Sequence, residues 1–260
     1  VMPIRENESS NTFLSEKTYL TVFVDGEKDG QIIRKVLEGD LLFSENTNNF
    51  FKWNYEFDNQ DFSVEYVNFI ENVKEDLVAS DNGEMYLKIV EASNGGRHDH
   101  FLKSGQVTNV HNILFALNND TKGAINITTL ENGSLSINSP FEGDYLRMAD
   151  QFAGSLKKNV DQPLMLRSLY NAAGLQFVFP ENIIKGDFQI VKSDDLESQQ
   201  DGLFVKVSSN GESKILGLMG GKGIVNTPKQ IKLGNLDFSL KFGSLERILP
   251  FEIKLNDFIA

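Results

Sequence analysis

Short runs in which apolar and polar residues alternate recur along the chain, and most of them end at a Gly, Asn or Asp. Successive side chains of a β-strand point to opposite faces, so such a run gathers its apolar residues on one face. The pattern predicts many closely spaced strands rather than long helices, and the 20 phenylalanines agree with it. The clearest strand candidates are residues 18–25, 62–69, 85–90, 124–129, 203–207 and 236–242.

Dipeptides that tolerate positive φ predict tight hairpin turns between these strands. They are Asp25-Gly26, Asn82-Gly83, Asn132-Gly133 and Asn210-Gly211.

One segment departs from the alternation of apolar and polar residues. Apolar residues at 145, 148, 149, 152 and 156 recur at helical spacing, which predicts an amphipathic helix over 144–158. Residues 164–170 are ambiguous between a strand and a second helix.

We therefore predict a mainly β fold, either antiparallel and β-sandwich-like or built of two packed β subdomains, with one or two short helices in the middle. The expected parts are an N-terminal β portion at 1–143, a helical insert at 144–172 and a C-terminal β portion at 173–260, which could also form one continuous domain.

Two of the predicted strands carry similar strings. Asp-Phe-Ser-Val-Glu-Tyr at 61–66 resembles Asp-Phe-Ser-Leu-Lys-Phe at 237–242. An internal duplication would produce this echo, and so would two independent strands with the same facing pattern.

The composition excludes several classes of function. With 260 residues the chain can bury a substantial core without covalent cross-links. The chain has no cysteine, which excludes disulfides, thiolate metal sites, cysteine nucleophiles and Cys-x-x-Cys-His haem attachment. Its net charge of −12 disfavours nucleic acids and acidic membrane surfaces, so we expect neutral, basic or apolar partners.

The three histidines are the candidate metal ligands. His98 and His100 form a His-x-His pair, and His111 follows eleven residues later. On a strand both rings of such a pair share one face, and imidazole suits zinc, copper, nickel and haem iron. Zinc sites need three or four ligands, the position of His111 is open, and Arg97 adds positive charge beside the pair. The alternative is a polar hairpin end with solvated histidines.

No catalytic motif accompanies these histidines. The glycine-rich stretch at 217–223 lacks the spacing of a phosphate-binding loop, and the sequence has no nucleophile elbow and no His-Glu-x-x-His helix. We expect no enzyme activity from the isolated domain.

The segment at 249–260 reads Leu-Pro-Phe-Glu-Ile-Lys-Leu-Asn-Asp-Phe-Ile-Ala and alternates strictly at first. The alternation predicts that Leu249, Phe251, Ile253 and Leu255 point inward. A parity break after Asn256 would turn Phe258 inward as well.

This segment resembles the strand of ResB-type cytochrome c biogenesis proteins that reads roughly Leu-Pro-Phe-x-Ile-x-Leu-x-Asp-Phe and leads to a Tyr-Pro-Gly element. Other strings resemble the fused ResB and CcsA proteins of Bacteroidetes-type bacteria. They lie at 13–19, 96–100, 123–127, 138–143, 162–171 and 220–223.

The resemblance implies a domain on the extracytoplasmic, periplasmic face of the cytoplasmic membrane, excised from a larger protein and held by flanking transmembrane helices. It implies a part in delivering haem and attaching it to apocytochrome c, as a scaffold or an apocytochrome-docking domain. The expected partners are apocytochrome c and the haem-handling transmembrane segments of the same or a partner chain. Haem would be handled by the parent protein, and we expect the isolated domain to bind it weakly or not at all, because no axial ligand of the family maps onto His98, His100 or His111.

Two functions of other classes fit the same features. An extracellular β-sandwich adhesin or carbohydrate-binding module suits the acidic charge and the β content. A small metal-dependent enzyme centred on the histidines is the other alternative.

Overall fold

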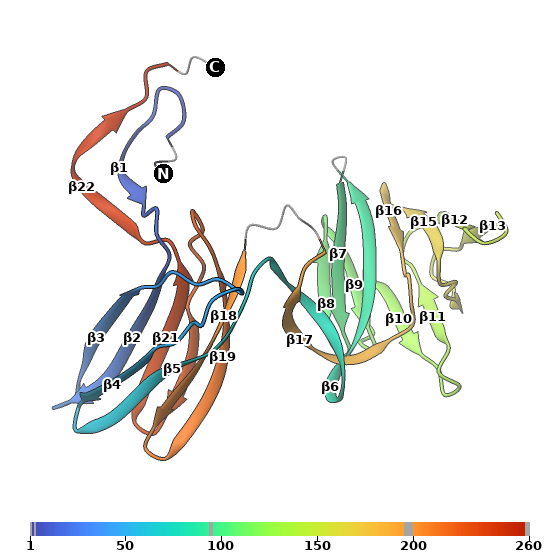
Figure 1. The fold of residues 1–260 in the computed structure, drawn as a ribbon. Coiled ribbons are helices and arrows are strands. Elements are labelled where there is room, and N and C mark those ends of the chain that lie inside the picture. Colours follow the sequence, from blue (N-terminus) through green and yellow to red (C-terminus); the bar gives the residue numbers. More distant parts are fainter. Residues whose placement is uncertain (1, 3, 94–95, 195–199, 258–260) are drawn as a thin grey trace. The chain divides into compact units, whose positions relative to one another are not determined.

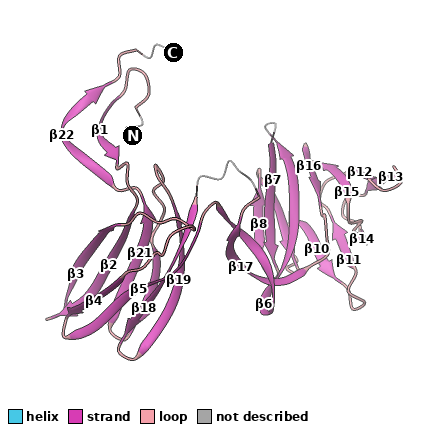
Figure 2. Ribbon diagram, in the orientation of Figure 1, coloured by secondary structure: helices cyan, strands magenta, loops and turns pink. Residues whose placement is uncertain are grey.

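The computed structural model describes residues 2, 4–93, 96–194 and 200–257, and these residues form β-strands and no helix (Figures 1 and 2). The predicted mainly β class is confirmed. The described residues therefore include no helix long and apolar enough to cross a membrane.

The chain divides into a first unit, Val1–Asp76 with Gln189–Ala260, and a second unit, Leu77–Phe188. These bounds differ from the expected boundaries near residues 143 and 172, because the second unit is an insertion within the first.

The first unit contains two four-stranded antiparallel sheets. Its strands are β2 (Tyr19–Lys28), β3 (Gln31–Asp40), β4 (Lys52–Phe57), β5 (Gln60–Ile70), β18 (Asp201–Ser209), β19 (Glu212–Gly220), β20 (Lys229–Leu233) and β21 (Leu236–Gly243). One sheet has the order β19-β18-β5-β4 and the other β20-β21-β2-β3. Each sheet thus joins a hairpin that precedes the insertion to a hairpin that follows it.

Alternate residues of these two sheets form one apolar core. Phe62 of β5 and Phe238 of β21 meet with ring centroids 5.4 Å apart, and both are buried. The two echoing strings of the sequence therefore occupy inner strands of the two sheets, where the same facing pattern is required. Trp53 packs so closely on Gly39 that a Cβ atom there would overlap its ring.

A separate two-stranded ribbon pairs β1 (Ser9–Leu14) with β22 (Glu246–Lys254) (Figure 1). The expectation that the apolar residues of the last segment point inward is wrong. Phe251 is 57% exposed and Ile253 43% exposed, and Leu249 and Leu255 are only partly buried. The alternation is present, but β22 pairs only with β1, so neither of its faces is buried as the faces of the core strands are. Phe258 lies outside the described residues.

The second unit also consists of two sheets. The first and last of its strands extend a few residues beyond the bounds of the unit. The strands are β6 (Val73–Ser93), β7 (Gly96–Lys103), β8 (Val107–Val110), β9 (Ile113–Leu117), β10 (Ile125–Thr129), β11 (Leu135–Asn138), β12 (Gly143–Arg147), β13 (Ala153–Leu156), β14 (Gln162–Pro163), β15 (Ser168–Ala172), β16 (Leu175–Val178) and β17 (Ile184–Lys192). One sheet has the order β14-β11-β10-β9-β8, in which β9 and β10 are parallel. The other has the order β13-β12-β15-β16-β6-β17, and β7 also pairs with β6.

The predicted helix over 144–158 is wrong, because this segment forms the hairpin of β12 and β13. Its helix-like spacing arises around a tight turn. Arg147 and Asp150 form an ion pair of 2.6 Å across the turn, and Gln151 has a φ of +58°. Met148 and Phe152 are each 52% exposed, whereas an amphipathic helix would have buried both. The ambiguous segment at 164–170 ends in strand β15.

Two predicted hairpin turns are confirmed and two are wrong. Turns at Asn132-Gly133 and Asn210-Gly211 lie between strands, as expected. Asp25-Gly26 and Asn82-Gly83 lie inside β2 and β6 instead. Gly83 is needed for close approach, because a Cβ atom there would overlap the backbone of Gly186.

Aromatic rings fill the core of the second unit. Tyr170 stacks on Phe177 with ring centroids 5.5 Å apart and planes inclined by 9°. The Met165 N–H donates a hydrogen bond of 2.8 Å to the Tyr170 hydroxyl oxygen. Burial raises the pKa of Tyr170 to about 12. The neutral phenol is thus the form that the folded unit favours.

Replacing Phe238 by Ala should destabilise the first unit, because the change removes a buried ring and leaves a cavity. We expect a loss of about 3–5 kcal/mol in the free energy of unfolding. Urea unfolding followed by the fluorescence of Trp53, which packs against the same core, measures it. Ile215→Ala is the control, since Ile215 is 58% exposed and its loss should change stability by only about 0.5 kcal/mol. Equal effects of the two substitutions would contradict the assigned core.

The raised pKa of Tyr170 predicts that the free energy of unfolding decreases at alkaline pH. The stabilising contribution is complete below the unfolded-state pKa of 10.0 and is lost as the pH rises towards about 12, because the unfolded chain releases this proton first. Calorimetric unfolding at pH 9 and pH 11 should show a smaller alkaline loss for Tyr170→Phe than for the unmodified protein. An identical loss in both would contradict the burial of an ionisable phenol at this position.

Candidate metal centre

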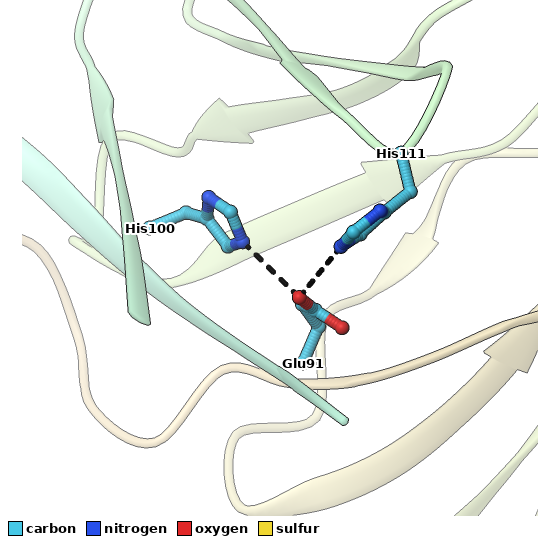
Figure 3. A group of neighbouring side chains, drawn as sticks. All are labelled: Glu91, His100 and His111. Atoms are coloured by element: carbon cyan, nitrogen blue, oxygen red, sulfur yellow. Dashed lines mark hydrogen bonds and ion pairs between the residues drawn. The ribbon is translucent and has the colours of Figure 1, made fainter. Parts of the chain in front are cut away.

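Glu91, His100 and His111 converge within the second unit (Figure 3). The His111 Nε2 atom lies 2.8 Å from Glu91 Oε1, and the His100 Nε2 atom lies 3.5 Å from the same oxygen. One ligand atom from each residue lies within 4.8 Å of the others. Two imidazole nitrogens are therefore aimed at one carboxylate oxygen.

Glu91 is held on an inner strand of the larger sheet of the second unit. Its strand, β6, pairs with β7 and β16, and the register sets Glu91 opposite Phe177. Leu87 and Ile89 occupy the preceding alternate positions and are fully buried, so the pleat also points Glu91 inward. Its side chain has no exposed surface. Carboxylates are rarely buried unless they are paired or bind a metal, so this position is unusual.

His100 reaches the cluster from β7. It lies opposite Ile89 in the ladder, and Leu102, two residues later, is fully buried on the same face. The His100 side chain is 28% exposed, so it stands at the margin of the core. His98 lies opposite Glu91 in the register, but it is exposed and does not belong to the cluster. Of the His-x-His pair, only His100 therefore contributes its ring to the cluster.

His111 reaches the cluster from the two-residue turn between β8 and β9. His111 and Asn112 have φ values of +48° and +67°, which is the arrangement of a type I′ turn. The Asn112 N–H donates a hydrogen bond of 2.8 Å to Asn109 Oδ1, which fixes the turn. A left-handed conformation is uncommon for a residue other than glycine, and such strain is often found at functional sites. The His111 side chain is 45% exposed.

Arg97 does not place its charge in the cluster. Its Nε atom lies 3.3 Å from Asp99 Oδ1, and the side chain is 70% exposed. Arg97 lines a different hollow of about 560 Å³, together with Arg167 and the apolar residues Val90 and Val178. Val90 precedes the inward-pointing Glu91, so this hollow lies on the opposite face of the sheet. The electrostatic objection to a cation at the histidines is therefore removed.

The cluster offers two imidazole nitrogens and one carboxylate oxygen as donor atoms. Two histidines and one glutamate are the ligand set of several catalytic zinc sites, in which water completes the coordination. Without a metal, the same groups form a hydrogen-bonded cluster around a buried carboxylate.

The sequence identified two of these three residues. It offered His98, His100 and His111, and the structure brings His100 and His111 together. Glu91 was missed, although its signal is visible in the sequence, since it follows Leu87 and Ile89 at the next inward position of an alternating run. A charged residue in phase with a buried face indicates a paired or ligating group.

The comparisons with known proteins assign no family to the chain. No protein-family model matches it, and no curated protein matches it.

Proposed function

We propose that this chain is an extracytoplasmic domain of a ResB-type cytochrome c maturation complex, in which it acts as a scaffold or as a docking domain for apocytochrome c. The resemblance of the strings between residues 13 and 258 supports the proposal. The net charge of −12 adds support, because it favours a neutral, basic or apolar partner. Haem ligation would belong to other segments of the parent protein.

The apolar surface of the terminal ribbon is the observation that carries the docking role. Ile248, Phe251 and Ile253 of β22 are 76%, 57% and 43% exposed. Phe251 and Ile253 belong to the segment that resembles the ResB strand. Exposed apolar residues gathered on one element are typical of an interaction surface.

The ribbon is also an element that a bound partner would stabilise. A sheet of only two strands, such as that of β1 and β22, is marginally stable in water. Contact with apocytochrome c or with the membrane-embedded part of the complex would cover the apolar side chains. The ribbon contains no histidine, so its role would be docking rather than haem ligation.

Substitutions on the ribbon test this role in the intact protein. The double variant Phe251→Ser with Ile253→Ser, introduced into the chromosomal gene for the protein, should lower covalently bound haem in c-type cytochromes several-fold. Haem staining of separated membrane proteins measures the loss, and immunodetection confirms that the variant accumulates normally. Ile32→Ser is the matched control, since Ile32 of β3 is 81% exposed but lies outside the ribbon. Normal haem staining in the double variant would contradict docking through the ribbon, and normal staining after disruption of the gene would contradict the whole proposal.

A carbohydrate-binding module or adhesin is the second candidate. A hollow of about 800 Å³ in the first unit is lined by polar side chains suited to sugar hydroxyls, among them Asn54, Glu56 and Lys206. Sandwich architectures serve many unrelated functions, so the resemblance of this chain to such modules is a resemblance of fold class alone. Glycan binding by the purified chain, together with normal cytochromes c after disruption of the gene, would favour this candidate.

A further inference from the structure

We propose that Glu91, His100 and His111 bind one divalent transition-metal ion, with zinc as its representative, through Glu91 Oε1 and the Nε2 atoms of both histidines. This inference goes beyond the proposed function and does not depend on it.

The distances between the donor atoms suit a small ion. A tetrahedral zinc ion with bonds of about 2.0–2.2 Å holds its ligand atoms roughly 3.3–3.5 Å apart. The two nitrogens lie 2.8 and 3.5 Å from Glu91 Oε1, two separations that bracket this spacing, and all three donor atoms lie within 4.8 Å of one another. The His100 and His111 side chains are 28% and 45% exposed, so their rings have room to adjust these distances.

The charges favour a cation at the same point. The Glu91 side chain is fully buried, and a buried carboxylate is costly unless positive charge or hydrogen bonds compensate it. A divalent ion beside Oε1 would supply that charge directly. The Nε2 lone pairs of both imidazoles would then be directed at the ion.

The donor types select the class of metal. Imidazole nitrogen suits zinc, copper, nickel and iron, whereas calcium and magnesium prefer sites made of oxygen ligands. The absence of cysteine in the sequence removes thiolate competition. The partial exposure of His100 and His111 leaves a solvent-facing side, so water or another small ligand would complete the coordination.

The three proposed ligands come from two paired strands and a tight turn. Glu91 and His100 lie on paired strands of one sheet, and His111 lies in a turn at the edge of the other sheet. A bound ion would therefore connect the two sheets of the second unit. The need for an imidazole at this position explains the left-handed backbone at His111. Asn or Gly would adopt this turn at lower cost but could not supply an imidazole.

Zinc titration of the metal-free protein tests the proposal. Competition with a chromogenic chelator should show one site per chain, and Glu91→Gln, His100→Ala and His111→Ala should each weaken zinc binding by at least roughly tenfold, since even residues behind the ligands contribute that much. His98→Ala is the matched control, because His98 is adjacent but outside the cluster, and it should retain the affinity of the unmodified protein. Circular dichroism of each variant establishes that the fold is retained.

Cobalt(II) provides a readout that needs no substitution. The unmodified protein loaded with one cobalt ion should show the intense visible absorption of a four- or five-coordinate ion with nitrogen ligands. No stoichiometric zinc binding, the weak absorption of octahedral hydrated cobalt, or equal losses of affinity in His98→Ala and His111→Ala would each overturn the proposal.

Discussion

The burial of the Glu91 carboxylate between two β-sheets is the constraint on which the candidate site depends. The pleat of β6 leaves this side chain no outward direction, because Leu87 and Ile89 fix which face of the strand is buried. The chain compensates the carboxylate with His100 from the neighbouring strand and with His111 from the facing sheet. This compensation accounts for a histidine with a φ of +48° in a two-residue turn, where the backbone alone would favour asparagine or glycine.

The first unit depends on a different constraint, which is pairing between segments far apart in the sequence. Each of its four-stranded sheets is completed only when a hairpin after residue 200 joins one before residue 71. The central ladders, β5 with β18 and β2 with β21, therefore close around the whole insertion. The terminal ribbon follows the same rule, since β1 pairs with β22. Its apolar residues Ile248, Phe251 and Ile253 remain exposed because that pairing supplies no second layer, and the proposed docking role rests on this exposure.

Sequence reasoning succeeded where the residue pattern and the local environment agree. The strands around Phe62, Leu203 and Phe238 were predictable because each has a buried face and a solvent face. The hairpin over 143–156 was not, because Met148 and Phe152 mimic helical spacing while flanking a turn held by the Arg147–Asp150 ion pair. Gly83 was mistaken for a turn residue because close approach and positive φ both select glycine. In the candidate site, two of the proposed ligands, His100 and His111, were visible in the sequence as histidines. The third, Glu91, required knowing which face of β6 is buried, and the exposure of His98 required knowing where that buried face ends.

The central claim is that a metal ion joins the two sheets of the second unit at Glu91. Anomalous diffraction from crystals of the zinc-loaded protein, collected above and below the zinc absorption edge, tests this claim most directly. The structure predicts one strong anomalous peak between Glu91 Oε1 and the Nε2 atoms of His100 and His111, at about 2.0–2.2 Å from each. A zinc-loaded crystal with no peak at this position, or with its zinc bound only at exposed carboxylates, would contradict the claim.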